Sequence, residues 1–248
     1  MLPAWPAALD GLRVGVLTDL HCGMPHSGLG MAERAVAALN AEAPDLICLL
    51  GDFVDRHGRF ARAVDPVALA ARLGRLRAPR GVVAVLGNHD WYAGGRAVAD
   101  ALEDAGVRVL EDEAAPADEP LWVAGTSDLR FRGGHVHRAL ARVPDDAPVL
   151  LLSHDPDLFP TVPARVSLTL SGHTHGGQVA IPLLRRPFVP SSYGERYVHR
   201  HVVEDDRRLY ISSGVGTSGF PIRLGRPPEV VVLTLRGTSR EGCRRARR

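Results

Sequence analysis

The chain has 248 residues, of which 45% are hydrophobic and 23% are charged, and its formal net charge is +2. All 30 strongly basic residues are arginine, because the sequence contains no lysine. This excludes enzyme classes that need a lysine ammonium group: P-loop nucleotide hydrolases, Schiff-base enzymes and pyridoxal-phosphate enzymes. The length and apolar fraction predict one compact domain over residues 1–248, neither fibrous nor disordered.

The positive charge is concentrated at the C-terminal end. Residues 236–248 hold six arginines and one acid, whereas the remainder of the chain has 24 basic and 27 acidic residues. A negatively charged remainder disfavours nucleic acid as a partner. For the arginine-rich tail we favour a solvated, disordered terminus, and the alternative is a weak peripheral contact with anionic lipid or RNA.

Cysteine usage and hydropathy predict the compartment. Cys22, Cys48 and Cys243 form no paired motif, which is typical of a reducing environment. The N-terminal segment lacks a basic region, and no apolar run approaches the roughly 18 residues of a membrane span. We therefore expect a cytoplasmic protein without a transmembrane segment, whose alternative location is the membrane periphery.

Short apolar runs rich in Val and Leu alternate with helical patterns. The alternation in the first half predicts parallel strand pairing, and the closely spaced, Gly-rich second half predicts antiparallel pairing. Residues 182–200 form the longest irregular stretch, which we expect to be a surface loop near the site. The strands are predicted at Leu12–Thr18, Leu46–Leu50, Gly81–Leu86, Val107–Leu110, Leu121–Ala124, Val149–Ser153, Val166–Leu170, Leu209–Ser213 and Val230–Leu235, and the helices at Met31–Ala41, Pro66–Leu76, Arg96–Ala105 and Val136–Val143.

Polar residues follow five of these strands, where α/β sheets present ligand sites. In an extended segment, residues i and i+2 project to the same side, so Asp19 with His21 can direct two donors at one point. His173 and His175 have the same spacing. The two pairs together predict a metal site.

Three further donors enlarge this predicted site. Asp52 offers a carboxylate that can bridge two cations, Asn88 an amide oxygen and His154 another imidazole. Mixed imidazole and carboxylate ligands favour Mn, Fe, Zn or Co over Ca or Mg. Seven donors exceed one tetrahedral site, so we expect two divalent metal ions that share Asp52 and a hydroxide. Such a centre stays positively charged and suits an anionic phosphate ester, which the metal-bridging hydroxide would attack in line.

In order along the chain, the segments around Asp19, Asp52, Asn88, His154 and His173 resemble the sequence blocks of the calcineurin-like metallophosphoesterases. The segments TDLHCG, LSHDPDLFP, SGHTHGGQV and SSGVGTSGFPIRLGRPPEVVVLTL are similar to a YkuE/YaeI-like bacterial phosphodiesterase subgroup. The resemblance implies a fold of class α/β (α+β): a four-layer αββα sandwich of two mixed β-sheets flanked by helices.

The resemblance also implies residue roles. His89 would be a general acid for the leaving oxygen, held by a neighbouring acid for which we name Asp90. Asp55 occupies a position where the purple acid phosphatases carry a tyrosine ligand, so no tyrosinate–iron centre is expected. One metal would bind Asp19, His21, Asp52 and His175, and the other Asp52, Asn88, His154 and His173.

Several residues have competing interpretations. Arg56 and Arg223 are candidate contacts to the substrate phosphate, and for Arg56 the alternative is an ion pair with Asp55 or a loop cap. The pairs His135 with His137 and His199 with His201 repeat the metal spacing without carboxylate neighbours, so we expect them at the surface. Cys22 is expected in the core.

The function predicted from the sequence is a dinuclear-metal-dependent phosphoesterase, with phosphodiesters preferred through the subgroup resemblance alone. The expected partner is a phosphate ester, either a small molecule or lipid-linked. The alternatives are a non-catalytic metal-binding scaffold of the same fold, a phosphomonoesterase and a nuclease. A nuclease would need a basic, aromatic-lined groove, which the negative charge of residues 1–235 and the 5% aromatic content disfavour.

Overall fold

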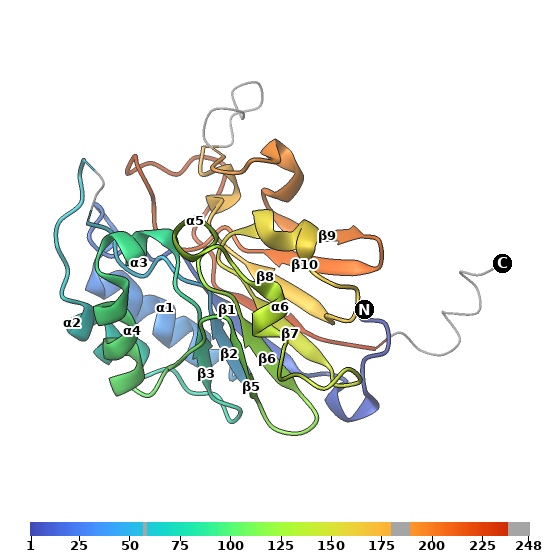
Figure 1. The fold of residues 1–248 in the computed structure, drawn as a ribbon. Helices are drawn as coiled ribbons and strands as arrows, with labels where there is room; N and C mark the ends of the chain where they lie inside the picture. The colour runs from blue at the N-terminus through green and yellow to red at the C-terminus, as the bar shows by residue number, and fades with distance from the viewer. Residues whose placement is uncertain (57–58, 180–188, 238–248) are drawn as a thin grey trace.

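The computed structural model describes residues 1–56, 59–179 and 189–237, and these fold into two β-sheets packed face to face (Figure 1). In the first sheet the strand order is β11-β1-β2-β3-β4, and in the second it is β5-β6-β7-β8-β10-β9. The first sheet contains β1 (Arg13–Leu17), β2 (Leu46–Leu49), β3 (Val82–Ala84), β4 (Arg108–Val109) and β11 (Val231–Thr234). The second contains β5 (Glu113–Pro116), β6 (Trp122–Gly125), β7 (Val149–Leu152), β8 (Leu168–Ser171), β9 (Arg200–Glu204) and β10 (Arg207–Ile211).

Helices cover the outer faces of both sheets, which gives the expected four layers of two mixed sheets flanked by helices (Figure 1). The first sheet packs against α1 (Leu29–Ala41), α2 (Pro66–Leu73) and α4 (Gly95–Asp104). The second packs against α6 (Val136–Ala139) and a 3-10 helix over Pro156–Thr161. Short helices α3 (Asn88–Tyr92) and α5 (Leu129–Arg132) lie in loops after β3 and β6.

The expectation of antiparallel pairing in the second half is wrong for the centre of the second sheet. β6, β7, β8 and β10 are all parallel neighbours, whereas the edge strands β5 and β9, and β11 in the first sheet, pair antiparallel. The crossover from β6 to β7 contains the predicted helix, but α6 covers only Val136–Ala139 of Val136–Val143, and the crossover from β7 to β8 has only a 3-10 helix, so the helical pattern between these strands is weak. The second sheet therefore gathers the carboxyl ends of four strands at one edge, as the first sheet does for β1, β2 and β3.

The central hydrophobic layer between the two sheets combines side chains from both. Val14, Val16 and Leu46 of the first sheet contact the same buried cluster as Leu150 and Leu168 of the second. Every residue of β2 and β7 is buried, which explains their uninterrupted apolar sequences. Among the described residues, no helix has the length and apolar composition needed to cross a membrane. The expected tail is described only as far as Gly237, and residues 180–188 of the irregular stretch also lie outside the described residues.

We expect Leu150→Ala to lower the free energy of unfolding by about 2–5 kcal/mol, because it leaves a cavity between the sheets at a fully buried position. The measurement is urea denaturation followed by circular dichroism. Val67→Ala is the control: Val67 lies on α2 and is 65% exposed, so its removal should change the unfolding free energy by no more than about 0.5 kcal/mol. Equal effects of the two substitutions would contradict this assignment of the core.

Candidate metal centre

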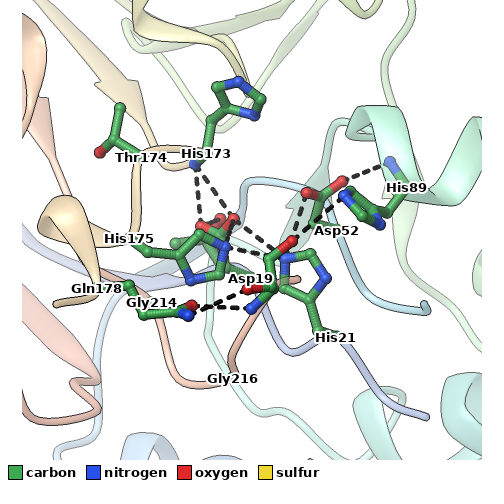
Figure 2. A network of polar contacts seen from close by, with 12 residues as sticks. Asp19, His21, Asp52, His89, His173, Thr174, His175, Gln178, Gly214 and Gly216 are labelled. Carbon is green, nitrogen blue, oxygen red and sulfur yellow. Dashed lines mark hydrogen bonds and ion pairs between the residues drawn. The ribbon is translucent and has the colours of Figure 1, made fainter. Parts of the chain in front are cut away.

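The carboxyl ends of the parallel strands bring the predicted donors together. Asp19 follows β1, Asp52 follows β2, His154 follows β7 and His173 follows β8. All seven side chains predicted as metal ligands are buried. Figure 2 shows Asp19, His21, Asp52 and His175 gathered side by side, with the backbone nitrogen of His173 directed at the Asp19 carboxylate.

Asp19, His21 and His175 form one cluster of donor atoms (Figure 2). The Nε2 atoms of His21 and His175 are 3.0 Å apart, and Nε2 of His175 is 3.4 Å from Oδ1 of Asp19. The second Asp19 oxygen accepts a hydrogen bond from the Thr18 hydroxyl at 2.8 Å. Three donors converging in a buried space are suited to one divalent cation.

Asp52, His154 and His173 form a second cluster. Nε2 of His154 lies 3.1 Å from Nδ1 of His173 and 3.2 Å from Oδ2 of Asp52. The same Asp52 oxygen is 3.4 Å from Nε2 of His21, so this carboxylate lies between the two clusters. Among the described residues, the buried Oδ1 of Asn88 has no hydrogen-bond partner. An unsatisfied buried acceptor costs free energy unless a ligand binds it. These two features fit a pair of cations.

The backbone at the clusters is left-handed, so the donors do not converge through the side-chain alternation of an extended segment, as the sequence suggested. The φ angles are 53° at Asp19, 44° at His21, 55° at Asp52, 67° at His173 and 52° at His175. Non-glycine residues rarely adopt such values, and strained backbone of this kind collects at functional sites. His173 and His175 accordingly diverge into different clusters, whereas Asp19 and His21 share one.

Glycine permits the close approach of the two loops that carry Asp52 and Asn88. A Cβ atom on Gly87 would collide with Oδ1 of Asp52 and lie 2.7 Å from Cε1 of His154. Because Oδ1 of Asp52 also accepts a 2.8 Å hydrogen bond from the backbone N–H of His89, the absence of a side chain at residue 87 positions the bridging carboxylate.

Three histidines have one ring nitrogen facing away from the donor cluster, the outer nitrogen, and it contacts a group that accepts a hydrogen bond. Nδ1 of His154 donates to the carbonyl of Leu50 at 2.6 Å, and Nδ1 of His21 lies 3.2 Å from Oδ2 of Asp55. Nε2 of His173 lies 3.1 Å from the carbonyl of Pro190. These contacts fix the tautomers that leave the inner nitrogens free for a metal. An arginine also approaches the outer nitrogen of His173 and of His175, Arg130 at 3.0 Å and Arg223 at 3.2 Å, and a cation at the inner nitrogen would require each of these contacts to loosen.

Burial and neighbouring charges together raise the pKa of two of the histidines and lower the pKa of the other two. Burial alone would lower the pKa of His21, but the carboxylates of Asp19 and Asp55 raise it to about 10. Burial opposes the charged form of His154 too, yet Asp52 raises its pKa well above the usual value. Burial lowers the pKa of His173 and of His175 to about 3, helped at His173 by the charge of His154. Each cluster of donor atoms thus combines one protonated and one neutral imidazole at neutral pH.

Asp55, not Asp90, contacts His89, so the expectation that Asp90 holds this histidine is wrong. Nδ1 of His89 is 3.1 Å from Oδ2 of Asp55, the same oxygen that contacts His21. The carboxylate of Asp90 instead accepts backbone N–H groups of four residues, Asp52, Phe53, Val54 and Gly87. Asp90 therefore fixes the loop that carries Asp52. The sequence offered a sign of this, because an acid at the third position of a helix commonly accepts N–H groups of its first turn.

The structure places the three arginines near the site differently from one another. Arg56 is exposed and, in the described part of the chain, is absent from the cavity lining. Arg223 is turned inward, where its guanidinium donates to the carbonyls of Ser213 at 2.7 Å and Gly216 at 2.6 Å. Arg130, which the sequence did not single out, lines the cavity and lies 3.0 Å from Nε2 of His173. No motif marked Arg130, because it belongs to the short helix α5.

The donors open into a cavity of about 630 Å³. Asp52, Asn88, His89, His173 and His175 line it together with Arg130. The other repeated histidine pairs, His135 with His137 and His199 with His201, lie outside the metal clusters found among the described residues. Cys22 is buried as expected, and Cys243 lies outside the described residues.

Two sheets with a buried His/Asp centre at their strand ends define a metallophosphoesterase fold, and comparison with known proteins agrees. The calcineurin-like phosphoesterase family profile matches residues 12–177. An uncharacterized metallophosphoesterase of Bacillus subtilis, YkuE, is 31% identical over 94% of this chain and 82% of that protein. The phosphodiesterase YaeI of Escherichia coli is 33% identical over 90% of this chain and 82% of that protein.

A solved structure supports the fold. A dimetal phosphatase from Danio rerio superposes with a TM-score of 0.53 at 14% identity, covering 91% of this chain and 93% of that one. The chain belongs to the calcineurin-like phosphoesterase family. It is accordingly a metallophosphoesterase, a hydrolase of phosphoric esters.

We expect divalent metal binding at pH 7 to release protons. His21, with its pKa raised to about 10, and His154, with its pKa also raised, carry protons that coordination must displace, whereas His173 and His175 are already neutral. Affinity for Mn²⁺ should therefore increase with pH through the neutral range. Titration calorimetry in buffers of different ionisation enthalpy measures the protons released, and His201→Ala, an exposed control, should release the same number. Binding without proton release would contradict the assignment.

Proposed function

We propose that this protein is a dinuclear-metal-dependent phosphoesterase that prefers phosphodiesters. The observation that carries the proposal is the position of Asp52, whose Oδ2 lies 3.4 Å from His21 in one cluster and 3.2 Å from His154 in the other. A carboxylate placed between two sets of donors is the arrangement by which proteins hold two metal ions close together.

The residues fit two cations. One would be held by Asp19, His21, Asp52 and His175, and the other by Asp52, Asn88, His154 and His173. When bound, two divalent ions lower the pKa of water and neutralise charge on the phosphoryl oxygens. Mixed nitrogen and oxygen donors without a thiolate favour Mn, Fe, Zn or Co.

His89 is placed to donate a proton to the leaving oxygen. Its Nδ1 is 3.1 Å from Asp55, which directs Nε2 toward the cavity that His89 lines. A carboxylate on the opposite ring nitrogen fixes the orientation of the imidazole. The Ser218 hydroxyl lies 3.4 Å from Nε2, and Ser218 lines the same cavity.

Arg130 is the cavity residue best suited to contact a substrate phosphate. Its side chain is 47% exposed. Its guanidinium lies 3.0 Å from Nε2 of His173, 2.9 Å from the carbonyl of Pro190 and 3.5 Å from the carboxylate of Asp155, so it lies at the border of the second cluster. A planar guanidinium pairs well with two phosphoryl oxygens.

The preference for diesters is supported by the similarity to YaeI, which is named a phosphodiesterase. A phosphomonoesterase would use the same centre, and so would a nuclease. A non-catalytic scaffold would have no use for a histidine fixed by a buried carboxylate beside the donors, and this favours catalysis.

The protein should hydrolyse bis(p-nitrophenyl) phosphate faster than p-nitrophenyl phosphate in the presence of Mn²⁺, and a chelator should abolish both activities. Asp52→Asn keeps an oxygen that accepts the His89 backbone N–H but removes the negative charge between the two donor clusters. Metal content measured by elemental analysis should therefore fall below that of the wild type. Arg96→Ala, a highly exposed change on α4, is the control. Full activity after removal of all metal would refute the proposal.

His89→Gln should lower kcat by about 100- to 10,000-fold while metal content stays unchanged, because His89 acts on the leaving oxygen and binds neither cation. Asp55→Asn should lower kcat by about 10- to 100-fold and also weaken metal binding, since Asp55 contacts both His89 and His21. A diester with a more acidic leaving alcohol should restore the activity of the His89→Gln variant more than that of the Asp52→Asn variant. If leaving-group acidity has no effect on His89→Gln, the role of His89 is wrong.

A further inference from the structure

One wall of the cavity consists of large apolar side chains that water reaches. Phe220 is 59% exposed, Ile222 is 58% exposed and Leu224 is 52% exposed, and all three line the cavity that holds the metal donors. Their spacing is i, i+2 and i+4, which in an extended segment directs alternate residues to one side. Exposed apolar groups that gather beside a polar site are typical of ligand binding.

This wall, defined by Phe220, Ile222 and Leu224, is held firmly by backbone contacts. The buried side chain of Gln178 donates to the carbonyls of Ser218 at 3.0 Å and Phe220 at 2.9 Å. The Leu224 N–H donates to the Gln178 carbonyl at 3.0 Å. Gln178 stands three residues after His175 in the chain, so the apolar wall is tied to the loop that carries a metal donor.

Arg223, between Ile222 and Leu224, follows the same alternation of side-chain direction. Its guanidinium is turned inward and bonded to the carbonyls of Ser213 and Gly216, while its neighbours Ile222 and Leu224 are exposed. A chain segment that turns its one charged residue inward and exposes its apolar ones reverses the usual surface pattern. The reversal needs a compensating contact in the functional state.

The cavity is therefore lined by both polar and apolar groups. Asp52, Asn88, His89 and Arg130 are among the polar ones, and Val179 adds to the apolar surface of the wall. Its volume of about 630 Å³ is that of a pocket for a whole small molecule rather than for a phosphate alone.

Resting on the proposed function, we propose that the substrate is a phosphate ester that carries an apolar alkyl or aryl group, and that this group lies along Phe220, Ile222 and Leu224. The phosphate is held at the metal donors and Arg130. Substrate selection then depends on burial of the apolar group, which the wall supplies, and the chemistry depends on the metal donors and His89.

The ester is a better occupant than a second copy of the chain or a membrane. A stable protein interface buries about 800 Å² on each partner, more than three half-exposed side chains provide. The three residues also share one cavity with the donors. A substrate bound at the donors therefore reaches the wall without any further partner.

The test uses non-hydrolysable alkylphosphonates from methyl to octyl and the Mn²⁺-loaded protein, with dissociation constants measured by titration calorimetry. Partial burial of each added methylene should strengthen wild-type binding by about 2-fold per methylene, since full burial is worth about 4-fold. Ile222→Ser and Leu224→Ser should each flatten this increase and leave methylphosphonate binding unchanged. Val203→Ser on β9 is the matched control, because Val203 is also 52% exposed and should keep the full increase.

Each other result overturns the inference in a distinguishable way. Equal wild-type affinities for methyl- and octylphosphonate would overturn it and leave the proposed function intact. An increase that survives Ile222→Ser and Leu224→Ser would show that the alkyl group binds elsewhere. Loss of vesicle binding in these variants, with the phosphonate series unchanged, would assign the wall to a membrane. Failure of even methylphosphonate to bind would refute the proposed function and, with it, this inference.

Discussion

The structure depends on the concentration of charge around Asp52. Its carboxylate is buried with a second carboxylate, Asp19, and the two negative charges repel each other more strongly than they would in water because burial lowers the effective dielectric constant. Opposite charge must therefore lie between them. Without metal, protons on His21 and His154 supply it, and the pKa values of these two histidines are raised for that reason. Divalent cations supply it more strongly, which makes the donor arrangement a site for metal rather than a set of ordinary ion pairs.

The fold delivers these donors because of strand direction. β1, β2 and β3 are parallel in one sheet, and β6, β7, β8 and β10 are parallel in the other, so loops from both sheets meet at one edge. The backbone then turns sharply, with positive φ at Asp19, Asp52 and His173. Such strain is tolerated where the surrounding structure fixes it, and the hydrogen bonds of the Asp90 carboxylate to the loop of Asp52 provide that support.

The sequence predicted the two sheets and the converging donors, because long apolar runs and polar residues at strand ends are strong local patterns. It did not predict the parallel order of the second sheet, since the one helix it predicted there, at Val136–Val143, is short, and the crossover from β7 to β8 has only a 3-10 helix. It named Asp90 as the partner of His89 because the two are adjacent in the chain, but adjacent residues of a helix face different directions. Asp55, 34 residues earlier, makes the contact instead. Arg130 was missed for a related reason: its contact with His173 spans 43 residues and no motif marks it.

The two arginines at the centre show how burial assigns different roles to the same side chain. Arg223 lies near His175, and its hydrogen bonds to the carbonyls of Ser213 and Gly216 use the donors that a phosphate would need. Arg130 lies near His173 but at the cavity surface, where water, and hence a substrate, reaches its guanidinium. Under the proposed function, Arg130 is the guanidinium that a substrate phosphate reaches, whereas Arg223 holds the segment that carries the apolar wall. Contact with the phosphate and contact with the apolar group would then belong to two segments far apart in the sequence, α5 and residues 220–224, that line one cavity.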